Sequence, residues 1–542
     1  MGDCTGITST GIYTANDKFS KHEHVNGVKQ YEAMYKRSIE DPEHFWGDLA
    51  RENLNWFHYF DRTVSKGGIT WFLDGQLNRT VDTAFHGLNF VRKVFVFKRT
   101  HSMDITMNSE IDVDMVEELR RHRPYCPPET VNTEDDMFIL YTSGSTGKPK
   151  GIVRTTGGYL LYTMMTTKYA FDLHNDDTFA CVADCGWITG HTNIVYGSLT
   201  DGSTTVLFES TPTYPDHGCY WDLVQRLKVT QFYTTPTAIR ALMAHGDDKV
   251  CEYDLSSLRV LGSVGEPINP EAWTWYSEVV GGRYCYIVDS YWQTETGGHI
   301  GVGLPGAIPM KPGSFTKPFF GVDFILTDKN SNGVKRNGVE GELCIRSPWS
   351  GMARTVYGDH SHYLQMYTAS HKGLYFTGDG CRRDKDEYYF ITGRINDVLC
   401  PSGHRISTTE LESTLTQHGA VAEAAVVGIP HRIKGEGIYC YVALTGDFEP
   451  SPELEKKLKM KVRSKIGAFA SPDIFVMVTD LPKTCSGKIM RRVLRKIAEG
   501  AEDSLNNLST LADPATVPVL INAMRSAVVR TTLNRSTYAF CS

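Results

Sequence analysis

The chain has 542 residues, of which 41% are hydrophobic and 22% are charged. This composition is typical of a folded globular protein and excludes a disordered or fibrous chain, and the length allows about two to four domains. Lys and Arg number 56 against 63 Asp and Glu, giving a formal charge of −7. This balance argues against nucleic acid or an anionic membrane as the main partner.

The 13 cysteines are scattered from Cys4 to Cys541. They show neither the density nor the spacing of a disulfide framework or a zinc ribbon, which favours a reducing compartment. The first residues include acidic side chains and have no apolar core, so they do not resemble a signal peptide. No apolar run approaches the roughly 18 residues that a membrane span needs. We therefore expect a cytoplasmic protein, with the nucleus as a second location.

Three patterns follow one another in the first four hundred residues. Residues 28–62 place aromatic and apolar side chains at helical spacing, which predicts helices in an N-terminal lead-in segment, residues 1–78. From 137 to 320, short apolar runs such as MFILY and DTFACVAD alternate with amphipathic stretches, which is typical of an α/β sheet whose strand-end loops carry the site. From about 321 to 393, runs interrupted by Gly and Asp predict antiparallel hairpins of a β-subdomain.

The remaining chain mixes helical and strand patterns again. Residues 394–520 are expected to form a small, mobile α+β domain, with a hinge near 394–397, and residues 521–542 a loosely ordered tail. The predicted fold class is therefore α/β, with a large N-terminal domain, residues 79–393, and a smaller C-terminal domain.

The strongest local signal is the strand MFILY followed by TSGSTGKPKG. Glycines let backbone N–H groups converge, and hydroxyl and ammonium groups add donors and charge, as a polyphosphate requires. A flexible polar turn is the plainest alternative. A P-loop does not fit, because Gly144 and Gly147 enclose only two residues and Pro149 follows Lys148. The predicted phosphate-binding residues are Thr142, Ser143, Gly144, Ser145, Thr146, Gly147 and Lys148.

This loop resembles that of the acyl-adenylate-forming enzymes, which include the acyl-coenzyme A synthetases. GSVGEPINP, DSYWQTETGG, YFTGDGCRRD, GRINDVLCPSGHR and LPKTCSGKIMRR resemble further segments of that family in the same order. Within the family, ADCGWITGHT, DSYWQTETGG and KPGSFTKPFFGVDF are most similar to the acetyl-coenzyme A synthetases. The resemblance implies ATP-dependent activation of acetate to an adenylate and transfer to coenzyme A. The alternatives are a propionyl-coenzyme A synthetase and a truncated, non-catalytic nucleotide-binding protein.

The resemblance also implies roles for individual residues. Lys488 is expected to bridge the carboxylate and the α-phosphate, where a cation spreads the developing charge. The same lysine is a target of reversible acylation in the family, so an acyltransferase and a deacylase are expected partners. Asp379 is expected to accept hydrogen bonds from the ribose hydroxyls. The other expected nucleotide-binding residues are Gly265, Glu266, Pro267, Asp289, Ser290, Tyr291, Trp292, Gln293, Thr294, Arg394 and Arg405.

The same resemblance indicates the size of the acyl group. Trp292 matches the bulky residue that closes the acyl pocket, where space remains for a methyl or ethyl group, and a methylene is worth about 1–3 kcal/mol in such a pocket. Acetate is therefore favoured over propionate. The other expected pocket walls are Trp187, Ile188, Thr189 and Val264. The expected coenzyme A contacts are Thr189, Ser402, Gly403 and Arg463. The expected Mg²⁺ positions are Glu295 at the triphosphate and a second site at Thr416, His418 and Val421.

One stretch of the family pattern is missing. After WFLDGQLN the family continues for roughly a hundred residues or more, comparable to a small domain, whereas this sequence passes almost directly from Asn78 to Val81. The resemblance implies the loss of several strands and of cations that bind the coenzyme A phosphate. Strands next to the gap would then expose their edges. The sequence leaves two explanations open, an altered splice or reading frame and a chain that folds poorly.

Overall fold

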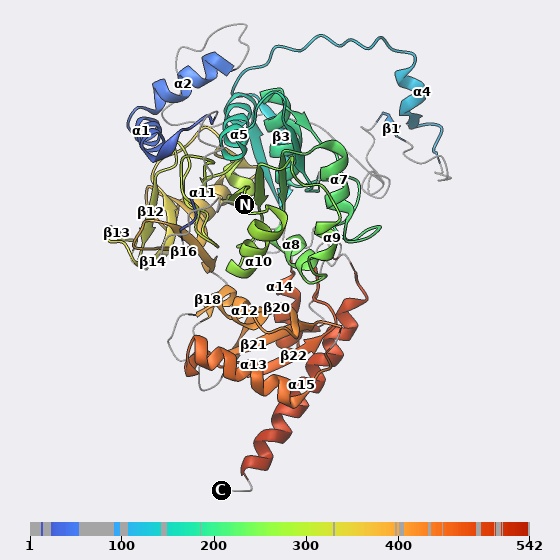
Figure 1. Cartoon of the computed structure of the whole chain (residues 1–542), viewed down its shortest axis with the longest axis vertical. Coiled ribbons are helices and arrows are strands. Elements are labelled where there is room, and N and C mark those ends of the chain that lie inside the picture. Colours follow the sequence, from blue (N-terminus) through green and yellow to red (C-terminus); the bar gives the residue numbers. More distant parts are fainter. Residues whose placement is uncertain are drawn as a thin grey trace.

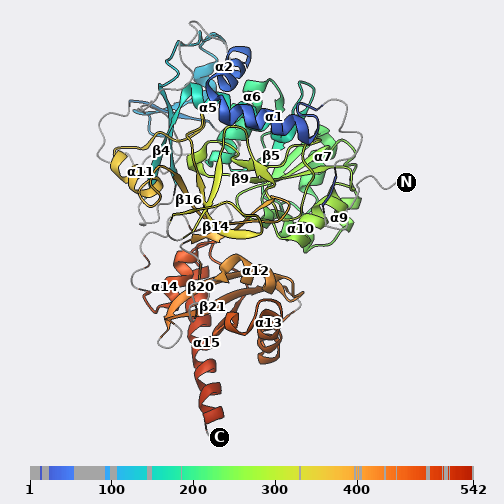
Figure 2. The same cartoon turned by 90° about the vertical axis from the view of Figure 1, so that its left-hand side faces the viewer.

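The computed structural model shows a large body and a smaller C-terminal body (Figures 1 and 2). It describes residues 12–14, 23–53, 92–97, 107–142, 149–184, 186–328, 331–395, 398–399, 401, 406–431, 435–446, 448–483, 489–502, 505, 511 and 513–539, with side chains as far as 530.

A seven-stranded sheet lies at the centre of the large body. Its strands, in spatial order, are β11 (Lys317–Pro318), β10 (Gly301–Val302), β9 (Tyr286–Tyr291), β8 (Val260–Ser263), β7 (Gln231–Thr234), β5 (Thr178–Cys181) and β6 (Thr204–Thr205). The strands from β9 to β6 are parallel, and β10 and β11 are antiparallel. β7 and β8 are buried along their whole length, as expected for parallel strands covered on both faces. The carboxyl ends of β7, β8 and β9 therefore lie at one edge of the sheet.

Helices connect and cover these strands. They bury their apolar faces in one hydrophobic core with the sheet. The helices are α5 (Thr156–Phe171), α6 (Ser198–Asp201), α7 (Cys219–Leu227), α8 (Pro236–Met243), α9 (Asp248–Cys251) and α10 (Pro270–Trp275), with the π-helical segments η1 (Gly190–Gly197) and η2 (Tyr276–Val280). The segment PEAWTWYSEVV forms α10 continued by a π-helix, and in the apolar run TTVLF only the two residues of β6 form a strand.

Two antiparallel sheets complete the large body. The first has the order β15 (Thr355–Val356), β4 (Lys150–Thr155) and β3 (Asp136–Thr142). The second has the order β13 (Gly333–Val334), β12 (Phe324–Thr327), β14 (Val339–Ile345), β16 (Tyr375–Arg383) and β17 (Tyr389–Arg394). The helix α11 (His360–Tyr367) precedes β16, and the 3₁₀ turn η3 (Thr294–Thr296) follows β9. The second sheet contains the hairpins that the Gly- and Asp-punctuated runs predict.

The N-terminal helices α1 (Gly27–Glu40) and α2 (Pro42–Asn53) confirm the helical pattern as far as residue 53. Further along the chain, β1 (Val94–Val96) pairs only with β2 (Asp112–Asp114) in the described part of the chain, and α4 (Met115–Leu119) continues from β2. This segment stands apart from the main body in Figure 1. Phe95 and Phe97 are 55% and 57% exposed, and the exposure of strand edges next to the gap stays a prediction.

The C-terminal body is a three-stranded sheet with helices on both faces. Its strands are β20 (Val421–His431), β21 (Gly435–Leu444) and β22 (Ile474–Val478). The helices are α12 (Thr408–Thr416), α13 (Pro452–Lys465), α14 (Arg491–Ala498) and α15 (Thr516–Ala539), together with the 3₁₀ turn η6 (Ala468–Ala470). The small hairpin β18 (Val398–Leu399) and β19 (Ile406–Ser407) precedes α12. One apolar cluster packs α12 and α13 against one face, and another packs α14 and α15 against the other.

The expectation of a loosely ordered tail from residue 521 is wrong for most of that segment. α15 continues to Ala539, and Leu520, Met524 and Ala527 are buried in the cluster with α14. These residues recur at helical spacing, so burial of one helix face stabilises the segment. Among the described residues, no helix combines the length and hydropathy that crossing a lipid bilayer requires.

Candidate active site

A cavity of about 640 Å³ lies where the carboxyl ends of the parallel strands meet β16, β17 and the C-terminal body. The expected site residues come from distant parts of the sequence, and twelve of them line this cavity. They are Trp187, Val264, Gly265, Glu266, Pro267, Asp289, Ser290, Tyr291, Trp292, Asp379, Arg394 and Thr416. The expected adenine, ribose and acyl residues thus face one space.

Asp379 is a buried carboxylate in the cavity wall, and three side chains hold it in place. It is 4% exposed, and its Oδ2 accepts hydrogen bonds from the Tyr291 hydroxyl at 2.6 Å and from Gln293 Nε2 at 2.7 Å. Its Oδ1 lies 3.1 Å from Nε of Arg394. Burial raises the pKa of Asp379, while Arg394 and the two hydrogen bonds oppose this shift. The arrangement fixes a carboxylate acceptor at the wall of the cavity.

The loop after β8 forms another wall. Gly265 has a φ of +95°, a conformation that favours glycine, and the chain turns there into the cavity. Glu266 is held by Arg240 Nη2 at 2.9 Å. Asp289 ends the apolar part of β9, and burial raises its pKa to about 7. Asp289 lines the same cavity as Asp379.

Trp292 follows β9 and narrows the cavity. Its Nε1 donates to the Tyr233 hydroxyl at 3.3 Å, and its ring packs edge-on against His299 with centroids 5.5 Å apart. These two contacts hold the indole in place. Val264 lines the same space, but Ile188 and Thr189, although buried, do not line it. The expected acyl pocket is thus only partly assembled in the described cavity.

Glu295 does not fit a metal ion in this conformation. Its carboxylate lies 2.6 Å from Lys150 Nζ and accepts a hydrogen bond from the Tyr367 hydroxyl at 2.5 Å. Burial alone would raise the pKa of Glu295, but Lys150 and the hydrogen bonds outweigh it and lower the pKa to about 2. A Mg²⁺ ion would have to displace Lys150, so no chemical step is assigned to a metal at this residue.

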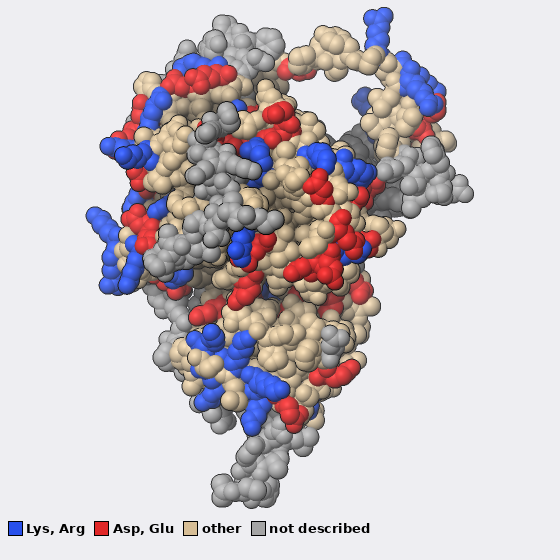
Figure 3. Space-filling model, in the orientation of Figure 1, with Lys and Arg blue, Asp and Glu red and all other residues tan. Residues whose placement is uncertain are grey.

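Of the expected residues of the C-terminal body that the structure describes, Thr416 lines the cavity, whereas His418, Val421 and Arg463 do not. The carbonyl of His418 accepts the N–H of Val421 at 2.8 Å, so one acceptor of the expected second Mg²⁺ site is already used. Arg463 is exposed on α13 near the exposed residues Lys456, Lys457 and Lys465. Figure 3 shows Lys and Arg side chains gathered over this part of the smaller body. This basic surface suits an anionic group.

Several expected site residues lie outside the described residues: Ser143, Gly144, Ser145, Thr146, Gly147, Lys148, Ser402, Gly403, Arg405 and Lys488. Thr142 ends β3 and pairs with Lys150 of β4, so the strand leads into the phosphate loop as predicted. Thr294 begins η3 beside Gln293 and is not in the cavity wall. The roles of these residues stay predictions.

The cavity wall also contains residues that the sequence analysis did not select. Lys311, Phe315, Arg382 and Glu412 line it. Lys311 forms ion pairs with Asp384 and, at 2.9 Å, with Asp386, which joins the loop after β10 to the β16–β17 turn. Lys311 and Phe315 lie in the segment KPGSF that carried the resemblance, so that segment could have indicated them. Nothing in the sequence indicated Glu412.

The sequence matches three protein-family models in succession. They are the acetyl-coenzyme A synthetase N-terminus at residues 31–82, the AMP-binding enzyme at 83–357 and the AMP-binding enzyme C-terminal domain at 410–488. The chain therefore belongs to the AMP-binding enzyme family. The match to the N-terminus model ends at residue 82 and the AMP-binding match begins at residue 83. This junction directly follows Asn78–Val81, where the sequence predicts the missing stretch.

Two curated relatives place the chain within this family. It is 58% identical over 413 residues to the acetyl-coenzyme A synthetase of Rhodobacter capsulatus, over 76% of this chain and 63% of that protein. It is 52% identical over 458 residues to the acetyl-coenzyme A synthetase of Brucella canis, over 84% of this chain and 70% of that protein. The chain thus spans less than two thirds of the first relative. A crystal structure of the anthranilate CoA ligase AuaEII with anthranoyl-AMP matches with a TM-score of 0.64 and 29% identity, covering 72% of each chain.

Proposed function

We propose that this protein activates acetate with ATP and transfers the acetyl group to coenzyme A. The observation that carries the proposal is the shared cavity, in which the buried carboxylate of Asp379 and the indole of Trp292 face one space. A carboxylate acceptor suits a ribose diol, and an indole beside it limits the acyl group. The naming of both curated relatives as acetyl-coenzyme A synthetases supports the same reaction.

The reaction has two steps. In the first, a carboxylate oxygen of acetate attacks the α-phosphorus of ATP, the bond to the β-phosphate oxygen breaks, and pyrophosphate leaves. In the second, the thiolate of coenzyme A attacks the acyl carbon and AMP leaves. Both reactants of the first step are anionic, so a cation must reduce their repulsion. We assign this role to Lys488, and acylation of its amine would abolish the charge.

Mg²⁺ bound to the triphosphate would supply further charge neutralisation. Because Glu295 is paired with Lys150, this chain offers no free carboxylate there in the described conformation. Acetate is the proposed substrate rather than propionate, because Trp292 occupies the space that a longer chain needs. The basic surface of α13, including Arg463, supports a contact with the phosphates of coenzyme A.

The test is acetate-dependent exchange of labelled pyrophosphate into ATP. We expect exchange in the wild type and its loss in Lys488→Ala. The matched control is Lys36→Ala, because Lys36 lies on α1 with its side chain 71% exposed. Exchange that persists in Lys488→Ala would refute the role of this lysine, and wild-type protein that binds ATP without exchange would favour the non-catalytic alternative.

Three further expectations stay predictions of the sequence. They are the domain division at residues 78 and 393 with a mobile C-terminal domain, the location in the cytoplasm, and regulation by an acyltransferase and a deacylase acting on Lys488.

A further inference from the structure

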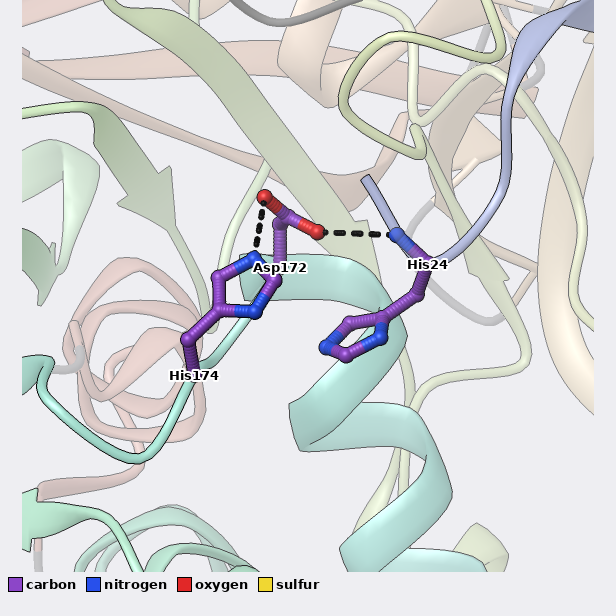
Figure 4. A group of neighbouring side chains, drawn as sticks. All are labelled: His24, Asp172 and His174. Atoms are coloured by element: carbon purple, nitrogen blue, oxygen red, sulfur yellow. Dashed lines mark hydrogen bonds and ion pairs between the residues drawn. The ribbon is translucent and has the colours of Figure 1, made fainter. Parts of the chain in front are cut away.

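A second group of chemically reactive side chains lies outside the cavity, where the segment before α1 meets the turn after α5. It consists of His24, Asp172 and His174 (Figure 4). One ligand atom from each residue lies within 4.8 Å of the others, and no other group of three His, Cys, Asp or Glu side chains in the described part of the chain has this spacing. Because His24 and Asp172 are 148 positions apart, the fold brings them together.

Asp172 organises this group. It is 3% exposed and adopts the left-handed conformation that ends α5, with a φ of +47°. Its Oδ1 accepts the backbone N–H of His24 at 3.2 Å, and its Oδ2 accepts Nε2–H of His174 at 3.2 Å. The carboxylate therefore lies between the two histidines, as Figure 4 shows. The imidazole rings stack with centroids 4.6 Å apart and planes 26° from parallel.

One ring nitrogen of His24 is already hydrogen-bonded. Its Nε2 lies 2.6 Å from the carbonyl oxygen of Leu173. A carbonyl only accepts, so Nε2 carries the hydrogen and Nδ1 carries the lone pair. Metal-bound histidines are commonly oriented by such a bond from the other ring nitrogen.

The cationic side chains near Asp172 are already paired with carboxylates. Arg259 lies 3.2 Å from Asp172 Oδ2 and 2.6 Å from Asp177 Oδ2, so one guanidinium is shared between two carboxylates. Lys168, the other nearby cation, is paired with Asp201 at 2.9 Å. Glu23 adds a carboxyl group whose two oxygens are buried and have no hydrogen-bond partner among the described residues.

We propose that His24, Asp172 and His174 bind a divalent transition-metal ion, for which zinc is the probe. Two imidazoles and a carboxylate are a zinc ligand set, with bonds of about 2.0–2.2 Å. Tetrahedral ligands at that distance lie about 3.4 Å apart, so small side-chain rotations would bring the three ligand atoms to this spacing. His174 exchanges its hydrogen bond for the metal by moving its proton to the other ring nitrogen. The ion would tie the segment before α1 to the α5–β5 connection.

The experiment uses the full chain after EDTA treatment, without nucleotide. Its thiols are alkylated, because Cys126 and Cys251 are exposed. Zinc affinity is measured by competition with a chromophoric chelator, and thermal unfolding is followed with and without zinc. We expect one tightly bound zinc per chain and a Tm that rises with zinc concentration. His174→Gln keeps an N–H for Asp172 but removes a ligand, and it should weaken zinc binding more than about tenfold.

The control is a second stacked histidine pair, His217 and His245, whose ring centroids are 3.4 Å apart. His245→Gln should leave zinc binding unchanged, whereas His24→Gln should weaken it as His174→Gln does. Cobalt(II) gives an independent readout, since its ligand-field absorption should be lost in His24→Gln. The proposal is overturned if the wild type binds no zinc, if His174→Gln and His24→Gln bind it normally, or if His245→Gln loses it.

Discussion

The Tyr291 hydroxyl donates to Oδ2 of Asp379 at 2.6 Å and so links the end of β9 to β16 at the wall of the cavity. Gln293 makes a second bond to the same oxygen at 2.7 Å. The carboxylate is therefore oriented before any ligand arrives, and preorganised polar groups lose little freedom when they bind.

The first prediction concerns this carboxylate. Asp379→Asn keeps the shape but removes the charge, and a hydrogen bond to a charged group contributes about 1.5–3 kcal/mol. The Kd for AMP should rise roughly 10- to 150-fold, measured by isothermal titration calorimetry. Tyr291→Phe removes only the orienting bond and should have a smaller effect. An Asp379→Asn variant that binds AMP normally would show that the ribose lies elsewhere.

The second prediction concerns the acyl group. Trp292→Gly removes the indole that packs on His299, which should weaken acetate use and admit longer chains. We expect the ratio of kcat/KM for acetate to kcat/KM for butyrate to change by roughly 10- to 200-fold for each of the two methylenes by which these acids differ, since one methylene contributes about 1–3 kcal/mol. Octanoate serves as the long-chain probe. Trp275→Gly, outside the cavity wall, controls for general damage. Wild-type protein that already prefers octanoate would contradict the assignment.

The third prediction concerns the buried Lys150–Glu295 pair. Glu295→Gln leaves Lys150 without its partner and should lower the free energy of unfolding by about 3–5 kcal/mol at neutral pH, measured with urea. The folded pKa of Glu295 is about 2, below the ordinary value of 4.5. The ion pair therefore stabilises the fold above about pH 4.5 and loses this contribution as the pH falls towards 2.

The difference between wild type and Glu295→Gln should shrink over the same pH range. The control is Glu40→Gln, because the Lys36–Glu40 pair is exposed at 3.8 Å and should contribute less than about 1 kcal/mol. A pH-independent difference for Glu295→Gln would mean that the charge of Glu295 does not account for the lost stability.

The fourth prediction follows from the missing stretch. Adenylation uses residues present here, whereas only Arg463 remains of the cations expected at the coenzyme A phosphate. Loss of two charge-assisted bonds should raise the coenzyme A requirement by roughly two to four orders of magnitude. Pyrophosphate exchange and acetyl-coenzyme A formation are compared on one preparation, beside a chain with the stretch restored. Normal coenzyme A saturation in the short chain would show that other residues bind the phosphate.

The sequence predicted the parts of the fold whose pattern is local. The runs MFILY and DTFACVAD, for example, contain most of β3 and all of β5. Pairings between distant residues were not predictable. The Lys150–Glu295 ion pair and the contact of His24 with Asp172 depend on tertiary packing, to which no local pattern points.

Helix α15 was also not predictable from its sequence pattern. Its sequence mixes Thr, Asn and Ser with few charges, so its apolar stripe is weak, and only burial of Leu520 and Met524 against α14 makes the helix evident. For the site, family-like motifs pointed to Trp292, Asp379 and Gly265, which line one cavity, while their roles stay predictions. The motifs did not indicate that Ile188 and Thr189, which precede η1, would lie outside the cavity wall.

In the proposed reaction, a carboxylate oxygen of acetate attacks the α-phosphorus of ATP. Acetate labelled with ¹⁸O at both carboxylate oxygens tests this step when the AMP formed is analysed by mass spectrometry. We expect one ¹⁸O in each AMP, whether the adenylate passes its acetyl group to coenzyme A or is hydrolysed at the acyl carbon. AMP that carries no label from acetate would show that acetate does not attack the α-phosphorus.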